Sequence, residues 1–219
     1  MATASVLNRF SAPTRRWFTG AFSAPTSAQT GAWSAIADGH NTLVIAPTGS
    51  GKTLSAFLWA LDRLARDTAT PETVTTDTAT PDTARTGNDK ADRPPGTRVL
   101  YISPLKALGV DVARNLRAPL TGITRAAQEL GEPEPGITVG VRSGDTDPAM
   151  RRSLVKTPPD ILITTPESLY LMLTSAARET LRQVHTVIVD EVHAVATTKR
   201  GTHLVLSLER LDELLERPA

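Results

Sequence analysis

Short runs of apolar residues alternate along the chain with segments in which apolar residues recur every three or four positions. Five of these runs are nearly continuous. They are TLVIAP (42–47), RVLYISP (98–104), ITVGVR (137–142), DILITTP (160–166) and TVIVDE (186–191). A continuous apolar run is typical of a strand whose sheet is covered on both faces. The five runs therefore predict five β-strands.

The segments between these runs carry apolar residues at helical spacing. One set is Leu54, Phe57, Leu58, Leu61 and Leu64, a second is Leu105, Leu108, Val112 and Leu116, and a third is Leu204, Leu208, Leu211 and Leu215. Each set forms one apolar stripe along a helix. Strands that alternate with helices predict a three-layer α/β fold around a parallel sheet. Ligands of such sheets bind at the carboxyl ends of the strands.

Residues 67–97 interrupt this alternation. The segment repeats the sequence DTATP, and its only aliphatic residue larger than alanine is Val74. So polar a segment cannot bury enough apolar surface to offset the entropy of ordering it. It predicts a disordered insertion within one domain, with residues 1–66 before it and residues 98–219 after it belonging to the same fold.

Composition narrows the class of protein. The chain has 219 residues, no cysteine and a net charge of +1. The absence of cysteine excludes disulfides and thiolate metal sites, and it favours a cytoplasmic location. The small net charge means that any nucleic-acid contact must come from local loops. No apolar run reaches the ~18–20 residues of a membrane helix, so no membrane contact is expected. The first 37 residues contain arginine but no acid, as transit peptides do, although their aromatic residues favour folded structure.

The stretch APTGSGKT (46–53) follows a predicted strand and opens a predicted helix. It matches the P-loop pattern, with Ala46 where the strictest form has glycine. Glycines let backbone N–H groups turn inward around phosphates, the lysine reaches the β- and γ-phosphates, and the threonine hydroxyl binds Mg²⁺. The predicted nucleotide cradle consists of Thr48, Gly49, Ser50, Gly51, Lys52 and Thr53.

A second acidic motif follows the strand 186–191. In TVIVDEVH, Asp190 is placed to hold Mg²⁺ together with Thr53, and Glu191 is placed to deprotonate an attacking water. A GTPase would show an Asn-Lys-x-Asp guanine reader, which is absent, and a small-molecule kinase does not usually need the second acid. The pair of acids therefore favours hydrolysis of the nucleotide over transfer of its phosphate to a substrate.

Several motifs in one order resemble superfamily 2 helicases of the DEAD/DEAH-box type, and the Lhr (large helicase-related) family in particular. They are APTGSGKT, PLKAL (104–108), VRSGDT (141–146), TTPESLYLML (164–173) and DEVHAV with KRGTHLVLSLERL after it. The resemblance implies a RecA-like domain that binds ATP and Mg²⁺. It also implies that Lys52 and Glu191 are catalytic, and that His193 couples the γ-phosphate site to a neighbouring domain.

The resemblance extends to the segment FSAPTSAQ (22–29), which looks like the adenine-reading Q motif. Gln29 would read the adenine edge with its amide, assisted by Thr26. An aromatic residue upstream would stack on the base. Phe10 is favoured for this role, with Phe18 and Trp17 as alternatives.

The family grips the phosphates of a single strand with loops at strand ends. The matching residues here are Pro104, Lys106, Arg142, Ser143, Gly144, Asp145, Thr165, Pro166, Glu167 and Ser168. The implied partner is single-stranded nucleic acid, with DNA favoured over RNA.

The family continues with a Ser-Ala-Thr motif and a second RecA-like domain, and neither is present in this sequence. The first RecA-like domain is therefore expected to be incomplete at its C-terminus. Two interpretations stay open. One is the ATP-binding part of a 3′→5′ helicase or translocase, and the other is a nucleotide-binding fragment with no motor activity of its own.

Overall fold

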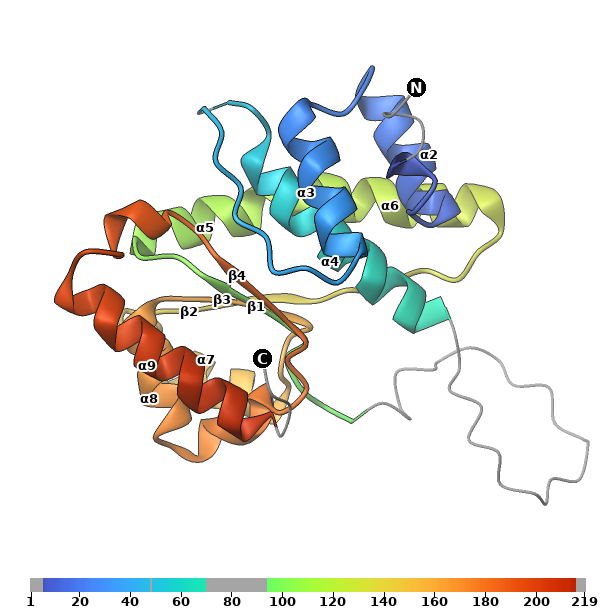
Figure 1. Cartoon of the computed structure of the whole chain (residues 1–219). Helices are drawn as coiled ribbons and strands as arrows, with labels where there is room; N and C mark the ends of the chain where they lie inside the picture. Colours follow the sequence, from blue (N-terminus) through green and yellow to red (C-terminus); the bar gives the residue numbers. More distant parts are fainter. Residues whose placement is uncertain (1–5, 48, 70–93, 216–219) are drawn as a thin grey trace, which may run out of the picture.

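A four-stranded parallel sheet lies at the centre of the molecule (Figure 1). The computed structural model of the chain describes residues 6–47, 49–69 and 94–215. The strands are β1 (Val99–Ile102), β2 (Val139–Arg142), β3 (Ile161–Thr164) and β4 (Thr186–Val189), in the order β2-β3-β1-β4. β1 and β3 are buried along their whole length, as their uninterrupted apolar sequences predict. All four strands lie within predicted runs.

The fifth predicted strand, 42–47, is not a strand in the structure. Residues 41–47 have no regular secondary structure, and Leu43 and Ile45 are 71% and 86% exposed. On the side of β4 away from β1, no described strand is paired with β4. The segment 42–47 does not form backbone hydrogen bonds with that edge, so it is not part of the sheet. The prediction was wrong because an apolar run becomes a strand only where a neighbouring strand accepts its hydrogen bonds.

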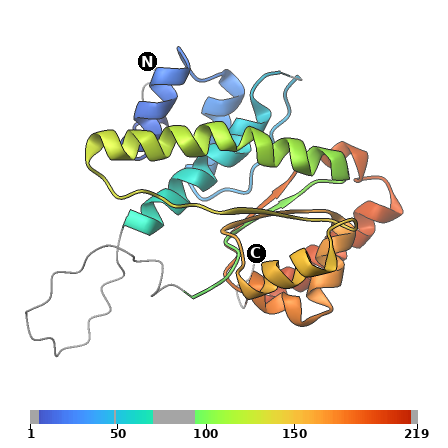
Figure 2. The ribbon, with the colours of Figure 1, turned by 180° about the vertical axis from the view of Figure 1, so that it is seen from behind.

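One face of the sheet is covered by the helices that precede β1 and the two that follow it. They are α2 (Ala12–Ala21), α3 (Ser27–Ala37), α4 (Lys52–Ala69), α5 (Lys106–Asn115) and α6 (Arg117–Leu130). Figure 2 shows α5 and α6 running one after the other along this face, with α4 beside them. Val99 and Tyr101 of β1 point into this layer and share its core with Phe57 and Leu61 of α4.

The opposite face is covered by the helices that follow β2, β3 and β4. They are α7 (Pro148–Lys156), α8 (Pro166–Leu173), the 3₁₀ helix η2 (Ala176–Leu181) and α9 (Lys199–Leu214). Leu100 and Ile102 alternate with the residues that face α4, and they pack here with Leu169 and Leu204. A short 3₁₀ helix, η3 (Val192–Ala194), joins β4 to the loop before α9. The three predicted layers are therefore present, with a core on each side of the sheet.

The boundaries predicted for the insertion 67–97 need correction at both ends. Residues 67–69 are the last residues of α4, and Thr97 is fully buried with its N–H donating to the carbonyl of Thr180 at 2.8 Å. Residues 70–93, where the rest of that prediction falls, lie outside the described residues. Within the described part of the chain, no helix is both long and apolar enough to span a membrane.

Candidate functional site

The Q-like segment is joined directly to the P-loop. Thr26 caps α3 through the N–H of Gln29, while the Gln29 side chain accepts from the N–H of Thr26. This capping box fixes both side chains at the start of the helix. The Thr26 hydroxyl then donates to the carbonyl of Ser50 at 3.2 Å, and the Gln29 amide donates to the carbonyl of Gly51 at 3.5 Å. The structure thus brings together two motifs that are more than twenty residues apart in the sequence.

The P-loop turns tightly before α4. Gly49 and Gly51 have φ of 83° and 80°, in the left-handed region that favours glycine. At Gly51 a Cβ atom would also lie 2.5 Å from Nε2 of Gln29, so a larger residue would displace the Q-like segment. α4 begins at Lys52, whose ammonium donates to the carbonyl of Ala46 at 2.8 Å across the loop. Thr53 is exposed in the first turn, and Thr48 lies outside the described residues.

The acidic motif lies at the carboxyl end of β4. Both oxygens of the Asp190 carboxylate are bonded: Oδ2 accepts from the Tyr101 hydroxyl, and Oδ1 accepts from the N–H of Glu191 at 2.9 Å. Burial and the neighbouring Asp190 raise the pKa of Tyr101 above its ordinary value, so the phenol stays a donor.

Glu191 has a strained backbone. Its φ of 48° and ψ of 42° lie in the left-handed region, and it is the only residue other than glycine with positive φ in the described part of the chain. Such a conformation costs ~1–3 kcal/mol and is concentrated at functional sites. The strain turns the chain sharply after Asp190. The Glu191 carboxylate lies 3.2 Å from Nε2 of the exposed His193, so the predicted base is in contact with the residue predicted to couple the site to a neighbouring domain.

The residues present fit a nucleotide triphosphate with Mg²⁺. The loop offers backbone N–H groups at a helix N-terminus, and no ion pair of the described residues involves Lys52. Thr53 and Asp190 are an oxygen donor set of the kind that Mg²⁺ prefers, and that ion takes most of its other ligands from phosphates and water. Between the described P-loop residues and the two acids there is no direct hydrogen bond. They are linked instead through Phe57 of α4, whose ring stacks on Tyr101.

The prediction that Phe10 stacks on adenine is wrong. Phe10 is 3% exposed, and its ring meets Trp33 and Trp59 edge-on at centroid distances of 5.1 and 5.3 Å. No face of its ring is open to a base. The two alternatives are also committed to packing, since Phe18 is buried and Trp17 lies against α6 at Gly122.

An aromatic residue that the sequence reasoning did not choose is accessible. Phe22 is 44% exposed and lies four residues before Thr26, whose hydroxyl reaches the P-loop. The signal available in the sequence was its position as the first residue of the Q-like segment; in the structure it follows the end of the helix that buries Phe18.

The loop after β2 is held by a residue that was not predicted. Arg151 of α7 donates to the carbonyls of Thr146 at 2.8 Å and Gly144 at 2.7 Å, with a longer bond of 3.4 Å to Ser143. The partial burial of Arg142 lowers the pKa of its guanidinium, and the nearby charge of Arg151 lowers that pKa further. The half-buried Arg142, together with Ser143, Gly144 and Asp145, forms a loop at the carboxyl edge of the sheet with two guanidinium groups beside it.

The residues at the start of α8 are placed differently from the prediction. Thr165, Pro166 and Ser168 are buried, and the Thr165 hydroxyl bonds both the hydroxyl and the N–H of Ser168. These side chains shape the helix N-terminus and do not offer hydroxyls to solvent, which corrects the prediction that they grip a strand directly.

Glu167, the exposed residue of that set, is paired with Arg200 of α9. Both guanidinium nitrogens Nε and Nη2 reach its carboxylate, the second at 3.0 Å. This hydrogen bonding lowers the pKa of Glu167 to about 2. Of the remaining predicted contacts, Pro104 is buried at the end of β1, and the side chain of Lys106 lies outside the described part of the structure.

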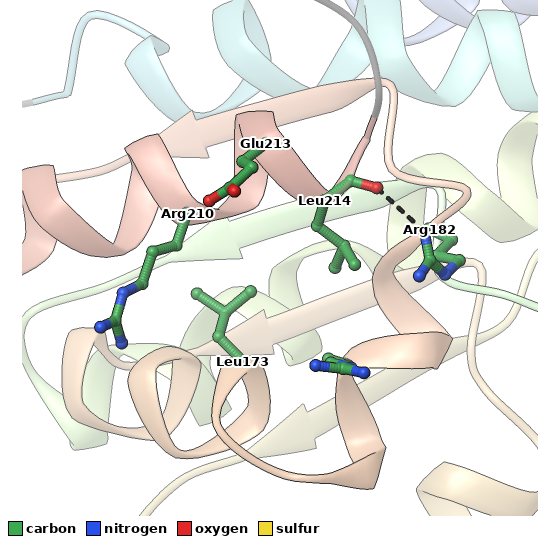
Figure 3. Close-up of a pocket in the computed structure, with 6 residues that line it drawn as sticks. Leu173, Arg182, Arg210, Glu213 and Leu214 are labelled. Atoms are coloured by element: carbon green, nitrogen blue, oxygen red, sulfur yellow. Dashed lines mark hydrogen bonds between the residues drawn. The ribbon is translucent and has the colours of Figure 1, made fainter.

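A cavity of about 390 Å³ lies away from all these motifs, between α8, η2 and α9 (Figure 3). Since η2 leads into the amino end of β4, the cavity lies near the amino ends of the strands, whereas Asp190 lies at the carboxyl end of β4. Its arginines have structural contacts. Arg178 and Arg182 pair with Glu179, Arg182 also donates to the carbonyl of Leu214, and Arg210 lies over the ring of Tyr170. The cavity is therefore not the nucleotide site.

Comparison with known proteins agrees with this geometry. A sequence profile described as DEAD/DEAH box helicase matches residues 26–218, which is most of the chain. The chain belongs to the DEAD/DEAH box helicase family. The matched range begins at Thr26, the residue whose side chain joins the Q-like segment to the P-loop.

Individual relatives confirm the predicted resemblance to Lhr helicases. The chain is 56% identical over 212 residues to the Lhr helicase/uracil glycosylase of Escherichia coli, covering 96% of this chain and 13% of that protein. It is 46% identical to the ATP-dependent helicase Lhr-Core protein 2 of Thermococcus barophilus, in a match that covers 92% of this chain and 21% of that protein. A solved structure of the Mycobacterium smegmatis helicase Lhr bound to ssDNA and AMP-PNP matches with a TM-score of 0.83 and 66% identity, covering 98% of this chain and 24% of that one. The chain thus spans a quarter or less of the length of these relatives, and its fold is that of their RecA-like domain.

Proposed function

We propose that the chain is the ATP-binding motor domain of an ATP-dependent 3′→5′ helicase or translocase that acts on single-stranded DNA. The observation that carries this proposal is the strained Glu191 immediately after Asp190 at the end of β4. Hydrolysis of a nucleotide requires one carboxylate to hold the metal and a second to activate water. Asp190, held by hydrogen bonds, and Glu191, at the sharp turn after it, match these two requirements. The Mycobacterium smegmatis Lhr structure, which holds ssDNA and AMP-PNP, supports the choice of ligands.

The P-loop residues hold the triphosphate in this proposal. The N–H groups of residues 49–53 bind the phosphates in this proposal. To do so, the Ser50 N–H leaves the carbonyl of Pro47, to which it donates at 3.3 Å, and the Lys52 ammonium moves from the carbonyl of Ala46 to the β- and γ-phosphates. Thr53 and Asp190 would hold Mg²⁺, which supplies charge neutralisation when it is bound.

Glu191 is the general base of the proposed reaction. Its carboxylate accepts a proton from the attacking water, and its strained backbone fixes the direction in which it points. His193, 3.2 Å from that carboxylate, reports the state of the site to a neighbouring domain.

The adenine is read by the Q-like segment. Gln29 keeps lone pairs and one N–H for the base edge while its other contacts hold it at the P-loop. Phe22 takes the stacking role that the sequence suggested for Phe10, because its ring is accessible whereas that of Phe10 is packed on both sides.

Single-stranded DNA lies along the carboxyl edge of the sheet in this proposal. Arg142 and the loop 143–146 contact its phosphates, and the N-terminal N–H groups of α8 supply a second contact. Such contacts carry no base information, which fits a motor that moves along any sequence.

Two substitutions separate binding from hydrolysis. Lys52→Ala should weaken the affinity for ATP, whereas Glu191→Gln should leave affinity nearly intact and slow turnover by ~10²–10⁴-fold. Glu209→Gln, at an exposed position of α9, is the matched control. Affinity is measured on the chain with a fluorescent ATP analogue, and phosphate release is measured with a second RecA-like domain and single-stranded DNA present. Unchanged turnover in Glu191→Gln would remove the assigned base.

A second candidate is a nucleotide-binding module that does not turn over ATP. The observation in its favour is that no hydrogen bond joins the P-loop to Asp190 or Glu191 within the described residues. The same assay separates the two candidates. Binding that depends on Lys52, with no phosphate release even when the second domain is present, would favour the module over the motor.

A further inference from the structure

Tyr101 links the helix that begins in the P-loop to the acidic motif, because its ring packs on Phe57 of α4 and its hydroxyl reaches Asp190. Its ring lies in the middle of β1, faces α4, and is 1% exposed. It stacks on Phe57 of α4 with the centroids 4.8 Å apart and the planes inclined by 24°. α4 is the helix that begins at Lys52, so the ring is fixed against the helix that carries the P-loop.

The hydroxyl of the same side chain reaches the acidic motif. It donates to Oδ2 of Asp190, on the neighbouring strand β4. The other carboxylate oxygen accepts from the N–H of Glu191 at 2.9 Å, and the Asp190 N–H donates to the carbonyl of Ile102 at 3.0 Å. Two hydrogen bonds therefore hold the carboxylate and a third fixes its backbone, and of these three only the bond from Tyr101 has a side-chain donor.

A carboxylate that binds a metal is usually held by such an outer partner. Hydrogen bonds from neighbouring groups orient the ligand and tune its basicity, and their loss typically costs 10–100-fold in metal affinity. Each oxygen of Asp190 keeps lone pairs after accepting one bond, so the carboxylate can hold Mg²⁺ or its water while Tyr101 still donates.

We propose that Tyr101 is a positioning residue that orients the Asp190 carboxylate for Mg²⁺ and ties its position to the P-loop helix through Phe57. This inference rests on the proposed function, because it assigns Asp190 to the metal. Tyr101 touches neither nucleotide nor metal itself. Its effect is confined to the energy of placing the carboxylate.

The conservative variant Tyr101→Phe tests this. It keeps the ring and its stacking on Phe57 and removes only the hydroxyl. Binding of a fluorescent ATP analogue is titrated with Mg²⁺, starting from a buffer with EDTA. We expect the Mg²⁺ concentration at half-saturation to rise about tenfold or more, while affinity for the metal-free nucleotide stays as in the unmodified chain. Tyr170→Phe, on α8 and outside the site, is the matched control and should change neither quantity.

A cycle with Asp190→Asn shows whether the two residues act together. If Tyr101 works through Asp190, then Tyr101→Phe has no further effect on Mg²⁺ dependence in the Asp190→Asn background. An unchanged Mg²⁺ half-saturation in Tyr101→Phe would overturn the inference while leaving the proposed function intact, provided that Lys52→Ala still abolishes binding. An equal loss of metal-free and Mg²⁺-dependent affinity would also overturn it, because that pattern reports general damage to the fold. Absence of Mg²⁺-dependent binding in the unmodified chain would overturn both.

Discussion

Substitution of Phe10 and of Phe22 tests whether Phe10 packs in the core and Phe22 stacks on the adenine base. Phe10→Leu removes an aromatic ring that meets Trp33 and Trp59 edge-on while keeping an apolar side chain in the core. Each edge-to-face pair is worth about 0.5–1.5 kcal/mol beyond its buried area, so the variant should lose about 1–3 kcal/mol of unfolding free energy. With a urea m-value of about 2 kcal/mol/M, the midpoint should fall by about 0.5–1.5 M. Affinity for ATP should stay the same.

Phe22→Leu is the reciprocal change. Phe22 is 44% exposed, but its ring also lies 5.9 Å from that of Trp17 and 4.9 Å from that of Phe18, so its loss should lower the urea midpoint, though by less than the loss of the buried Phe10. Base–aromatic stacking is worth about 1–3 kcal/mol, so the affinity for ATP should fall by about 5–150-fold. Unfolding is followed by the fluorescence of Trp33 and Trp59, and affinity by a fluorescent ATP analogue. The reasoning is refuted if Phe10→Leu weakens ATP binding at an unchanged midpoint, since that result requires an accessible ring.

Three further changes have expected outcomes. Gly201→Ala should lower the melting temperature, because the added Cβ would lie 2.1 Å from the backbone carbonyl oxygen of Val195; a thermal melt at unchanged temperature would contradict this. Burial, with a smaller contribution from Arg63, lowers the pKa of His185 to about 4 from an ordinary 6.5, so the unfolded chain binds the proton more readily and stability should fall as pH drops from 6.5 towards 4. Urea midpoints at two pH values measure that fall, which should be shallower in His185→Leu. Arg151→Gln should loosen the loop 143–146 and weaken binding of a fluorescent single-stranded oligonucleotide, whereas Arg125→Gln on the far helix α6 should not.

The sequence predicted the sheet well because the evidence for a buried strand is local. β1 and the first three residues of β3 form apolar runs, and such a run is typical of a strand that packs on both faces of its sheet. The P-loop and the acidic motif were predictable for a similar reason. Their chemistry requires particular residues at fixed spacing, and the positive φ of Gly49 and Gly51 is what those glycines supply.

Partners that are distant in sequence were not predictable. Tyr101 looked like one apolar residue of a strand, and Arg200 looked like one charge of a helix, yet they contact Asp190 and Glu167. Composition likewise gives the number of aromatic residues near the Q-like segment but not which of them the core takes. Phe10 is part of the core because its ring packs against Trp33 of α3 and Trp59 of α4. No local sequence pattern encodes how these two helices are placed relative to each other.

The segment 42–47 shows where local reasoning fails for a physical cause. Its apolar pattern is that of a strand, but a strand exists only as a pair, and the hydrogen bonds of an unpaired one must go to water. β4 uses one edge for β1, while Val187 on the same strand is 37% exposed and Leu43 and Ile45 of the segment are more exposed still. A strand paired with the open edge of β4 would give the segment 42–47 a hydrogen-bonding partner and would order the residues that lead into Gly49. The conformation of the phosphate-binding loop is then coupled to strand pairing, so that nucleotide affinity at Lys52 and hydrogen-exchange protection of β4 should rise together whenever such a strand is supplied.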